Sequence, residues 1–146
     1  NFQLHQTIWY PHLEIANHDI ARCIQQINSL HTFLVSDSCF SGTMFETSRS
    51  GGNNFTQKLE NIPSRWGLSS GRDEPVSDGN AGEHSPFAQA LIDFLQQSTE
   101  PTVLVSDLIQ EVKKTVGNNF AQQPIGNRLQ ELDKKGMGEF VLHREK

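Results

Sequence analysis

The sequence has few cysteines, few basic residues and no long apolar run, and each shortage excludes a class of protein. Two cysteines, Cys23 and Cys39, are too few for a disulfide scaffold, so we expect a reducing, cytoplasmic compartment. The 12 Lys and Arg residues against 17 Asp and Glu give a net charge of −5. That charge argues against a nucleic-acid partner, which needs a basic surface. No stretch approaches the roughly 18 apolar residues of a membrane span, so we expect no membrane partner.

The length and composition of the chain are typical of one mildly acidic domain. A chain of 146 residues, 35% of them hydrophobic, is long enough to bury a core. The acidic residues are unevenly placed, with eight carboxylates and no Lys or Arg between Asp73 and Val112. Solvated helix faces explain most such runs, and a negative field that favours a basic substrate is the alternative.

Helical apolar spacing occurs in three places. The residues after Asn17 predict a helix capped by that side chain, with Cys23 on its buried face. Ser85 and the proline after it predict the start of a second helix. Ser106 is expected to cap a third helix, which Gly117 ends.

Apolar and β-branched runs alternate with these helices. Strands are predicted at 31–37, 65–70 and 138–143, and the polar stretch from 43 to 63 predicts an exposed loop. Strands alternating with helices of this length indicate an α/β layer fold.

The segment 34–42 carries the strongest chemical signal. A predicted buried strand ends there in Cys39, which is followed by the small residues Ser41 and Gly42. Ligands bind at the carboxyl ends of strands in open α/β sheets. A thiol in that position can attack a substrate while its backbone N–H stabilises the developing oxyanion. The alternative is that Cys39 only fills space in the core, as most free cysteines do.

Val-Ser-Asp-Ser-Cys-Phe-Ser-Gly at 35–42 closely resembles the nucleophile segment of the caspase-like cysteine peptidases, in the metacaspase and orthocaspase branch. That branch has the pattern Asp-x-Cys-x-Ser-Gly after a buried strand. Further similarities follow in the family's order over most of residues 9–142: 70–79 is similar to the substrate-pocket loop, 84–91 to the small-subunit helix, and 123–124 with 136–141 to the closing strand.

The resemblance implies an α/β fold of the caspase-like type, a three-layer sandwich with a mostly parallel central sheet. Residues 1–146 would form only the C-terminal part of that one domain. Within it, 1–45 would bear the nucleophile, 46–64 would be an exposed loop where family members are processed, and 65–146 would resemble the small subunit.

The resemblance also implies roles for individual residues in cysteine endopeptidase chemistry. Cys39 matches the nucleophile, and its backbone N–H would be one oxyanion donor. Asp37 matches the acid at the floor of the specificity pocket, Asp73 matches a second pocket acid, and Ser69 or Ser77 would line the same cavity. A carboxylate two residues before the nucleophile lies on the same side of the strand and can pair with a guanidinium or ammonium group. We therefore expect cleavage after Arg or Lys, and a local turn or cap role is the alternative for Asp37.

The histidine base of such an enzyme is absent from its expected motif. For caspases it lies about 50 residues before the cysteine, which is upstream of Asn1. His84 lies in a family motif but is structural there. We expect the base, a second oxyanion donor and the first strands in an upstream segment, a partner without which this chain is not stable. None of the histidines present is followed by Gly: His5, His12, His18, His31, His84 and His143.

Two alternative functions and a possible calcium ligand follow from the same residues. The missing base leaves open an inactive caspase-like binding or scaffold module, and a small-molecule hydrolase on the same scaffold is a further alternative. No cofactor is assigned. Glu46 stands seven residues after Cys39, where metacaspases can place a calcium ligand. One carboxylate is no calcium site, because calcium takes six to eight oxygens.

Overall fold

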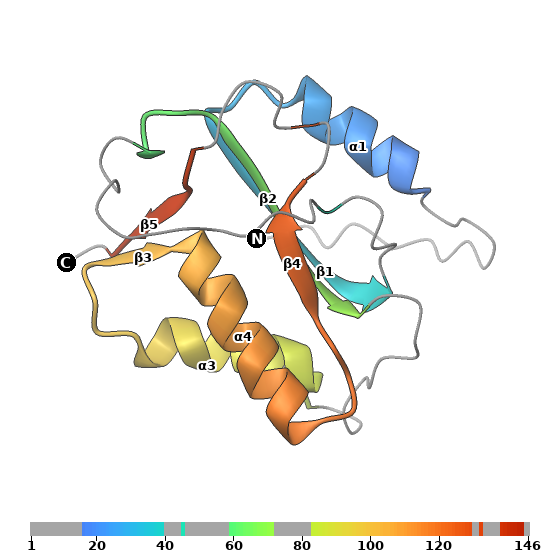
Figure 1. Cartoon of the computed structure of the whole chain (residues 1–146), viewed down its shortest axis with the longest axis vertical. Helices are drawn as coiled ribbons and strands as arrows, with labels where there is room; N and C mark the ends of the chain where they lie inside the picture. Colours follow the sequence, from blue (N-terminus) through green and yellow to red (C-terminus); the bar gives the residue numbers. More distant parts are fainter. Residues whose placement is uncertain are drawn as a thin grey trace, which may run out of the picture.

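The described part of the chain contains both helices and strands. The computed structural model describes residues 16–39, 45, 59–71, 83–129, 132 and 138–144. The expected mixture of helices and strands is confirmed (Figure 1). Its elements are α1 (Asn17–Gln26), β1 (His31–Cys39), β2 (Ser64–Gly71), α3 (Pro86–Gln97), β3 (Thr102–Leu104), α4 (Val105–Asn119), β4 (Ile125–Arg128) and β5 (Val141–His143).

The described strands form two small sheets. In the first, with the order β1-β2-β4, β1 and β2 are parallel and β2 and β4 are antiparallel. In the second, β3 and β5 are antiparallel. Among these pairs only β1–β2 is parallel, so the described residues do not form the mostly parallel sheet expected from the sequence. The short strands β3 and β4 were not predicted, because three or four residues carry too little alternation to register as a strand.

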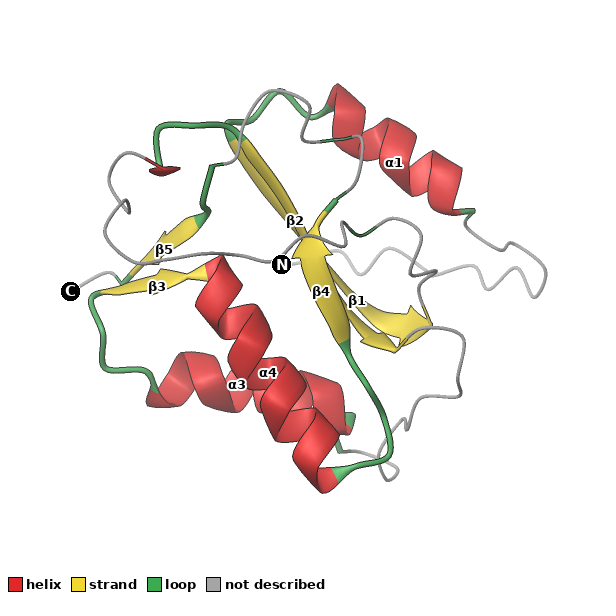
Figure 2. Cartoon of the chain, in the orientation of Figure 1, coloured by secondary structure: helices red, strands yellow, loops and turns green. Residues whose placement is uncertain are grey.

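Helices lie on both sides of the three-stranded sheet (Figure 2). On one side, Trp66 and Leu68 of β2 pack in one cluster with buried residues of α3 and α4. On the other side, Ile24 of α1 packs with Phe45 and Leu129, and Leu34 of β1 contacts that cluster. Successive side chains of a strand point to opposite faces, which explains how one sheet serves two clusters.

The first helix corrects one prediction from the sequence. The helix is present at Asn17–Gln26, but its N-cap is Ala16, and the Asn17 side chain does not cap it. Cys23, expected in the core, is exposed. The helix contacts its cluster through Ile24 and the half-buried Ile20. Because this contact is narrow, Cys23, the residue directly before Ile24, remains exposed to solvent.

α3 begins as predicted, whereas α4 departs from the prediction at both ends. Ser85 caps α3 as expected, its Oγ accepting a hydrogen bond from the Ala88 N–H at 3.0 Å, with proline at the first helical position. α4 begins at Val105, before the expected cap Ser106, and continues through Gly117 to Asn119. An isolated glycine lowers helix propensity by only about 1 kcal/mol. The buried apolar face of α4, with Val116 at its end, outweighs that cost.

A buried carboxylate takes the place of the expected cap at the start of α4. Glu139 is 6% exposed, and its Oε1 accepts a hydrogen bond from the Ser106 backbone N–H at 3.2 Å. The preceding residue, Gly138, lies against the Ile62 backbone, where a Cβ would come within 1.8 Å of the Ile62 carbonyl oxygen. Burial raises the pKa of Glu139, although hydrogen bonds with Ser106 and the charge of Arg128 act in the opposite direction.

Glu139→Gln is expected to equal or exceed the wild type in stability at neutral pH. Glutamine keeps the oxygen that accepts from Ser106 and removes a buried charge. Because the folded-state pKa of Glu139 lies above its unfolded value, the wild-type free energy of unfolding falls as pH rises through that interval. The difference between the two proteins should therefore shrink toward pH 4.5, the ordinary value of the group. Urea unfolding at several pH values measures this difference in the free energy of unfolding.

The matched control is Glu111→Gln, which changes an exposed glutamate of α4 that pairs with Lys114 at 3.8 Å. Exposed pairs of this kind contribute little, so we expect almost no effect at any pH. A Glu139→Gln variant that is less stable than the wild type by the same amount at every pH would contradict the prediction.

Candidate functional site

The carboxyl ends of β1 and β2 meet at one edge of the sheet. The two strands run parallel from the pair His31–Ser64 to the pair Ser36–Ser69, and after an irregularity Cys39 pairs with Gly71. Cys39 is thus the last residue of β1, at the sheet edge where ligands bind in α/β folds. Its side chain lies outside the described part of the structure.

Serine hydroxyls bind the backbone where β1 leaves its regular register. The Ser69 Oγ lies 2.8 Å from the Ser38 carbonyl oxygen and 2.9 Å from that of Gly71, so its proton is shared between two acceptors. Ser36 and Ser38 are joined through their hydroxyls at 2.6 Å. Ser69, expected to line the substrate cavity, is fully buried, and its hydroxyl holds the ends of the two strands together.

Asp37 is joined to the start of α3. The Ser85 Oγ donates to Asp37 Oδ2 at 2.6 Å and accepts from the Ala88 N–H at 3.0 Å. Asp37 itself is exposed, whereas Ser85 is buried. The helix N-terminus carries partial positive charge, which favours a carboxylate at this place. The structure therefore holds one oxygen of Asp37 in place and leaves the residue open to solvent.

Gln122 fixes the end of β2 from the other side. It is 5% exposed, and its Nε2 donates to the Ser70 carbonyl oxygen at 2.7 Å. Its Oε1 has no hydrogen-bond partner among the described residues. The segment between α4 and β4 is thereby attached one residue before Gly71, the backbone partner of Cys39. Sequence reasoning missed this contact, and the only signal was the position of Gln122 shortly before Pro124.

Comparison with protein-family models, with curated proteins and with solved structures finds no match to this chain.

The described histidines have separate roles. His31 begins β1, at the opposite end of the strand from Cys39. Its Nε2 donates to the Glu60 carbonyl oxygen at 2.8 Å, and its Nδ1 is hydrogen-bonded to the Ser64 hydroxyl at 2.7 Å. His143 is hydrogen-bonded to the Glu60 carboxylate. His84 is exposed and directly precedes Ser85 in the chain. The remaining three are His18, which is exposed, and His5 and His12, which lie outside the described residues.

Several of the expected site residues fall outside the part that the structure describes. They are the pocket residues Asp73 and Ser77 and the calcium candidate Glu46. In the described ranges, no three His, Cys, Asp or Glu residues gather as a metal site would require. No helix in the same ranges is both long and apolar enough to cross a bilayer.

Three features at the carboxyl ends of β1 and β2 suit the recognition of a cationic group. One oxygen of Asp37 is held by Ser85, the residue is exposed, and Cys39 follows it by two residues on the same strand. A carboxylate positioned in this way can form charge-assisted hydrogen bonds with a guanidinium or ammonium group.

Proposed function

We propose that this chain is the nucleophile-bearing, C-terminal part of a caspase-like cysteine endopeptidase that cleaves after Arg or Lys. The observation that carries the proposal is the Asp37 carboxylate, which accepts from the Ser85 Oγ at 2.6 Å at the strand edge where Cys39 ends β1. The Asp-x-Cys-x-Ser-Gly pattern at 37–42 supports the same assignment.

The arrangement of elements supports the caspase-like fold as part of this proposal. β1 and β2 are parallel, and helices lie on both faces of their sheet. β1 stands at one end of the described strand order, and Val35 near its middle is 41% exposed. An upstream segment would add strands along β1 and cover this side chain. An exposed edge strand favours association with another chain.

The proposed reaction uses two groups of this chain and one of the upstream segment. The Cys39 thiolate attacks the carbonyl carbon of the scissile bond, and the Cys39 backbone N–H donates to the resulting oxyanion. The C–N bond then breaks, and the leaving amine takes a proton from the upstream histidine. Water, deprotonated by that histidine, attacks the thioester and releases the acid and the free thiolate.

Asp37 would select the residue that precedes the scissile bond. The exposed carboxylate offers acceptors to a guanidinium or ammonium group, and Ser85 prevents it from rotating away. Charge-assisted hydrogen bonds of this kind are roughly twice as strong as neutral ones. An acidic residue in the same place would be repelled.

Fluorogenic peptides that end in Arg, Lys or Asp test the proposal in the protein together with its upstream segment. We expect release of the fluorophore from the Arg and Lys peptides and none from the Asp peptide. Cleavage of the Asp series alone would overturn the specificity. If no peptide is cleaved and an Arg-chloromethylketone leaves Cys39 unmodified in the folded protein, the peptidase proposal fails and a binding module takes its place.

A further inference from the structure

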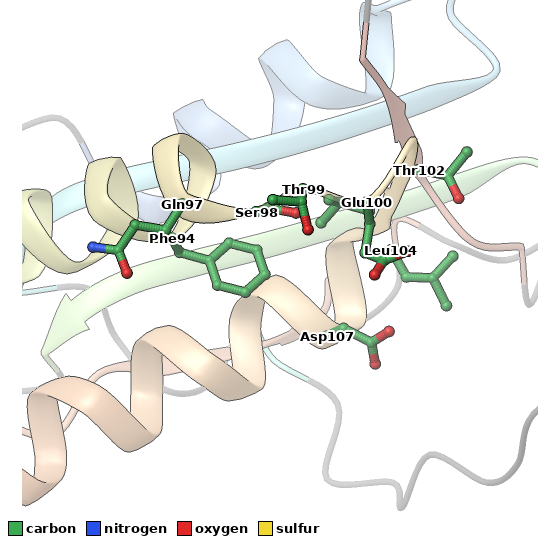
Figure 3. A pocket seen from close by; sticks show the side chains of 9 residues that line it. Phe94, Gln97, Ser98, Thr99, Glu100, Thr102, Leu104 and Asp107 are labelled. Carbon is green, nitrogen blue, oxygen red and sulfur yellow. The ribbon is translucent and has the colours of Figure 1, made fainter.

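A second surface feature lies away from the candidate site, where α3 ends and α4 begins. It is a groove of about 460 Å³ bordered by β3. Phe94 of α3 and Val103 and Leu104 of β3 provide its apolar part. Figure 3 shows Phe94 reaching from α3 toward α4, with Glu100 on the connection between them and Asp107 on the first turn of α4.

The polar side of the groove is acidic. Glu100 and Asp107 line it, both are exposed, and none of the lining residues is Lys, Arg or His. Asp107 also lies in the first turn of α4, where the helix dipole favours a carboxylate. Nearby, Arg144 donates to the carbonyl oxygens of Leu95, at 3.2 Å, and Ser98, so its charge is directed at the end of α3.

Among the described strands, β3 has a backbone partner on one side only, and its three residues line the groove. Within the described residues it pairs with β5 alone. The Arg144 N–H donates to Pro101 at 3.0 Å, and the Val105 N–H donates to Phe140 at 2.9 Å. Bonded and non-bonded positions alternate in an antiparallel pair. The backbone N–H of Thr102 therefore points away from β5, and the Thr102 side chain lines the groove.

We propose that this groove binds an extended, basic peptide segment of a partner protein, which pairs with the free edge of β3. Strand addition gives affinity through main-chain hydrogen bonds and specificity through alternate side chains. In this geometry every second side chain of the segment enters the groove. Basic side chains reach Glu100 and Asp107, and an apolar one between them packs on Phe94 and Leu104. The preferred pattern is thus basic-x-apolar-x-basic, and this binding is independent of the proposed peptidase activity.

The test uses a fluorescent peptide Lys-Thr-Leu-Thr-Lys, blocked at both ends, and the same peptide with Glu in place of Lys. Binding is followed by fluorescence anisotropy with the Cys39→Ala protein, so that cleavage cannot remove the peptide. We expect the Lys peptide to bind in a salt-dependent manner and the Glu peptide not to bind. Glu100→Gln together with Asp107→Asn should abolish most of the salt dependence, because the charges that cause it are gone. Equal binding of both peptides overturns the proposal.

A matched pair of variants tests the strand pairing. Thr102→Pro removes the outward N–H without breaking a bond to β5, and Pro is tolerated on edge strands. Thr102→Val keeps the N–H. We expect Thr102→Pro to weaken binding about 3- to 10-fold, the equivalent of one hydrogen bond, and Thr102→Val to change it little. If Thr102→Pro does not fold, amide shifts of Thr102 and Leu104 on titration of the Cys39→Ala protein decide the question.

Two results place the peptide elsewhere. Loss of binding in an Asp37→Asn variant would mean that the peptide occupies the candidate active site, and it would overturn the proposal. So would a peptide-independent dimer in sedimentation velocity that Thr102→Pro dissociates, because the edge of β3 would then belong to a second copy of the chain. Unchanged binding in Asp37→Asn and a monomer without peptide support the groove.

Discussion

Cys39→Ala is expected to lower the cleavage of an Arg-ended fluorogenic peptide at least about a thousandfold, because the nucleophile of a covalent mechanism has no substitute. The loss should appear in kcat and not in KM, because the Cys39 side chain is only a small part of the surface that binds the peptide. Active-site titration with an Arg-chloromethylketone, followed by mass spectrometry of the modified peptide, measures the same thing independently. The label should be found on Cys39 in the wild type.

The second cysteine of the chain supplies the control. Cys23 is an exposed thiol on α1, the helix whose Ile24 packs with Phe45 and Leu129. Cys23→Ala should retain full activity and full labelling at Cys39. Full activity in Cys39→Ala, or label found on Cys23 alone, would exclude the proposed mechanism.

Asp37→Asn is expected to reduce kcat/KM for Arg and Lys peptides by roughly 10²- to 10³-fold, because the bound peptide would cover the charge pair and the variant removes one of its partners. Asparagine has nearly the same shape and can still accept from the Ser85 Oγ. Peptides with a neutral residue before the scissile bond should lose much less. The comparison of kcat/KM across the three peptide classes is the measurement. Asp93→Asn is the control, because Asp93 lies on α3 and accepts only from Gln89 in the described structure, at 2.7 Å.

Ser85→Ala separates substrate recognition from a purely structural role of Asp37. Removing the N-cap hydroxyl costs about 0.5–2 kcal/mol of stability and also frees the carboxylate. If Asp37 serves only to fasten α3, both variants lower the melting temperature alike and reduce activity on all peptides alike. Selectivity lost in Asp37→Asn at unchanged stability is the signature of a pocket acid.

Much of the local structure could be predicted from short-range patterns. The strand predicted at 31–37 lies within β1, and the strand at 65–70 lies within β2. Ser85 caps α3 as its sequence indicates, since the cap bond reaches only to Ala88, three residues away. Interactions of that range leave a signature in the order of residues.

Other features depended on what each element contacts. Cys23 shares its helical stripe with Ile24 but is exposed, because α1 touches the sheet along a narrow line. α4 continues through Gly117 because its buried face extends to Val116. Neither propensity nor capping signals contain that information, since tertiary burial outweighs both.

In the candidate site, too, some features could be predicted from the sequence and others depend on tertiary contacts. The sequence by itself placed Asp37 and Cys39 at the carboxyl end of a predicted strand, because the apolar and β-branched run ends there. Only the tertiary structure decided that Asp37 meets Ser85, 48 residues away, and that Ser70 meets Gln122, 52 residues away. It also decided that β3 pairs with β5 and lines the groove that Glu100 and Asp107 make acidic. The physical reason is that such contacts depend on strand register and on how helices dock, which no local run of residues encodes.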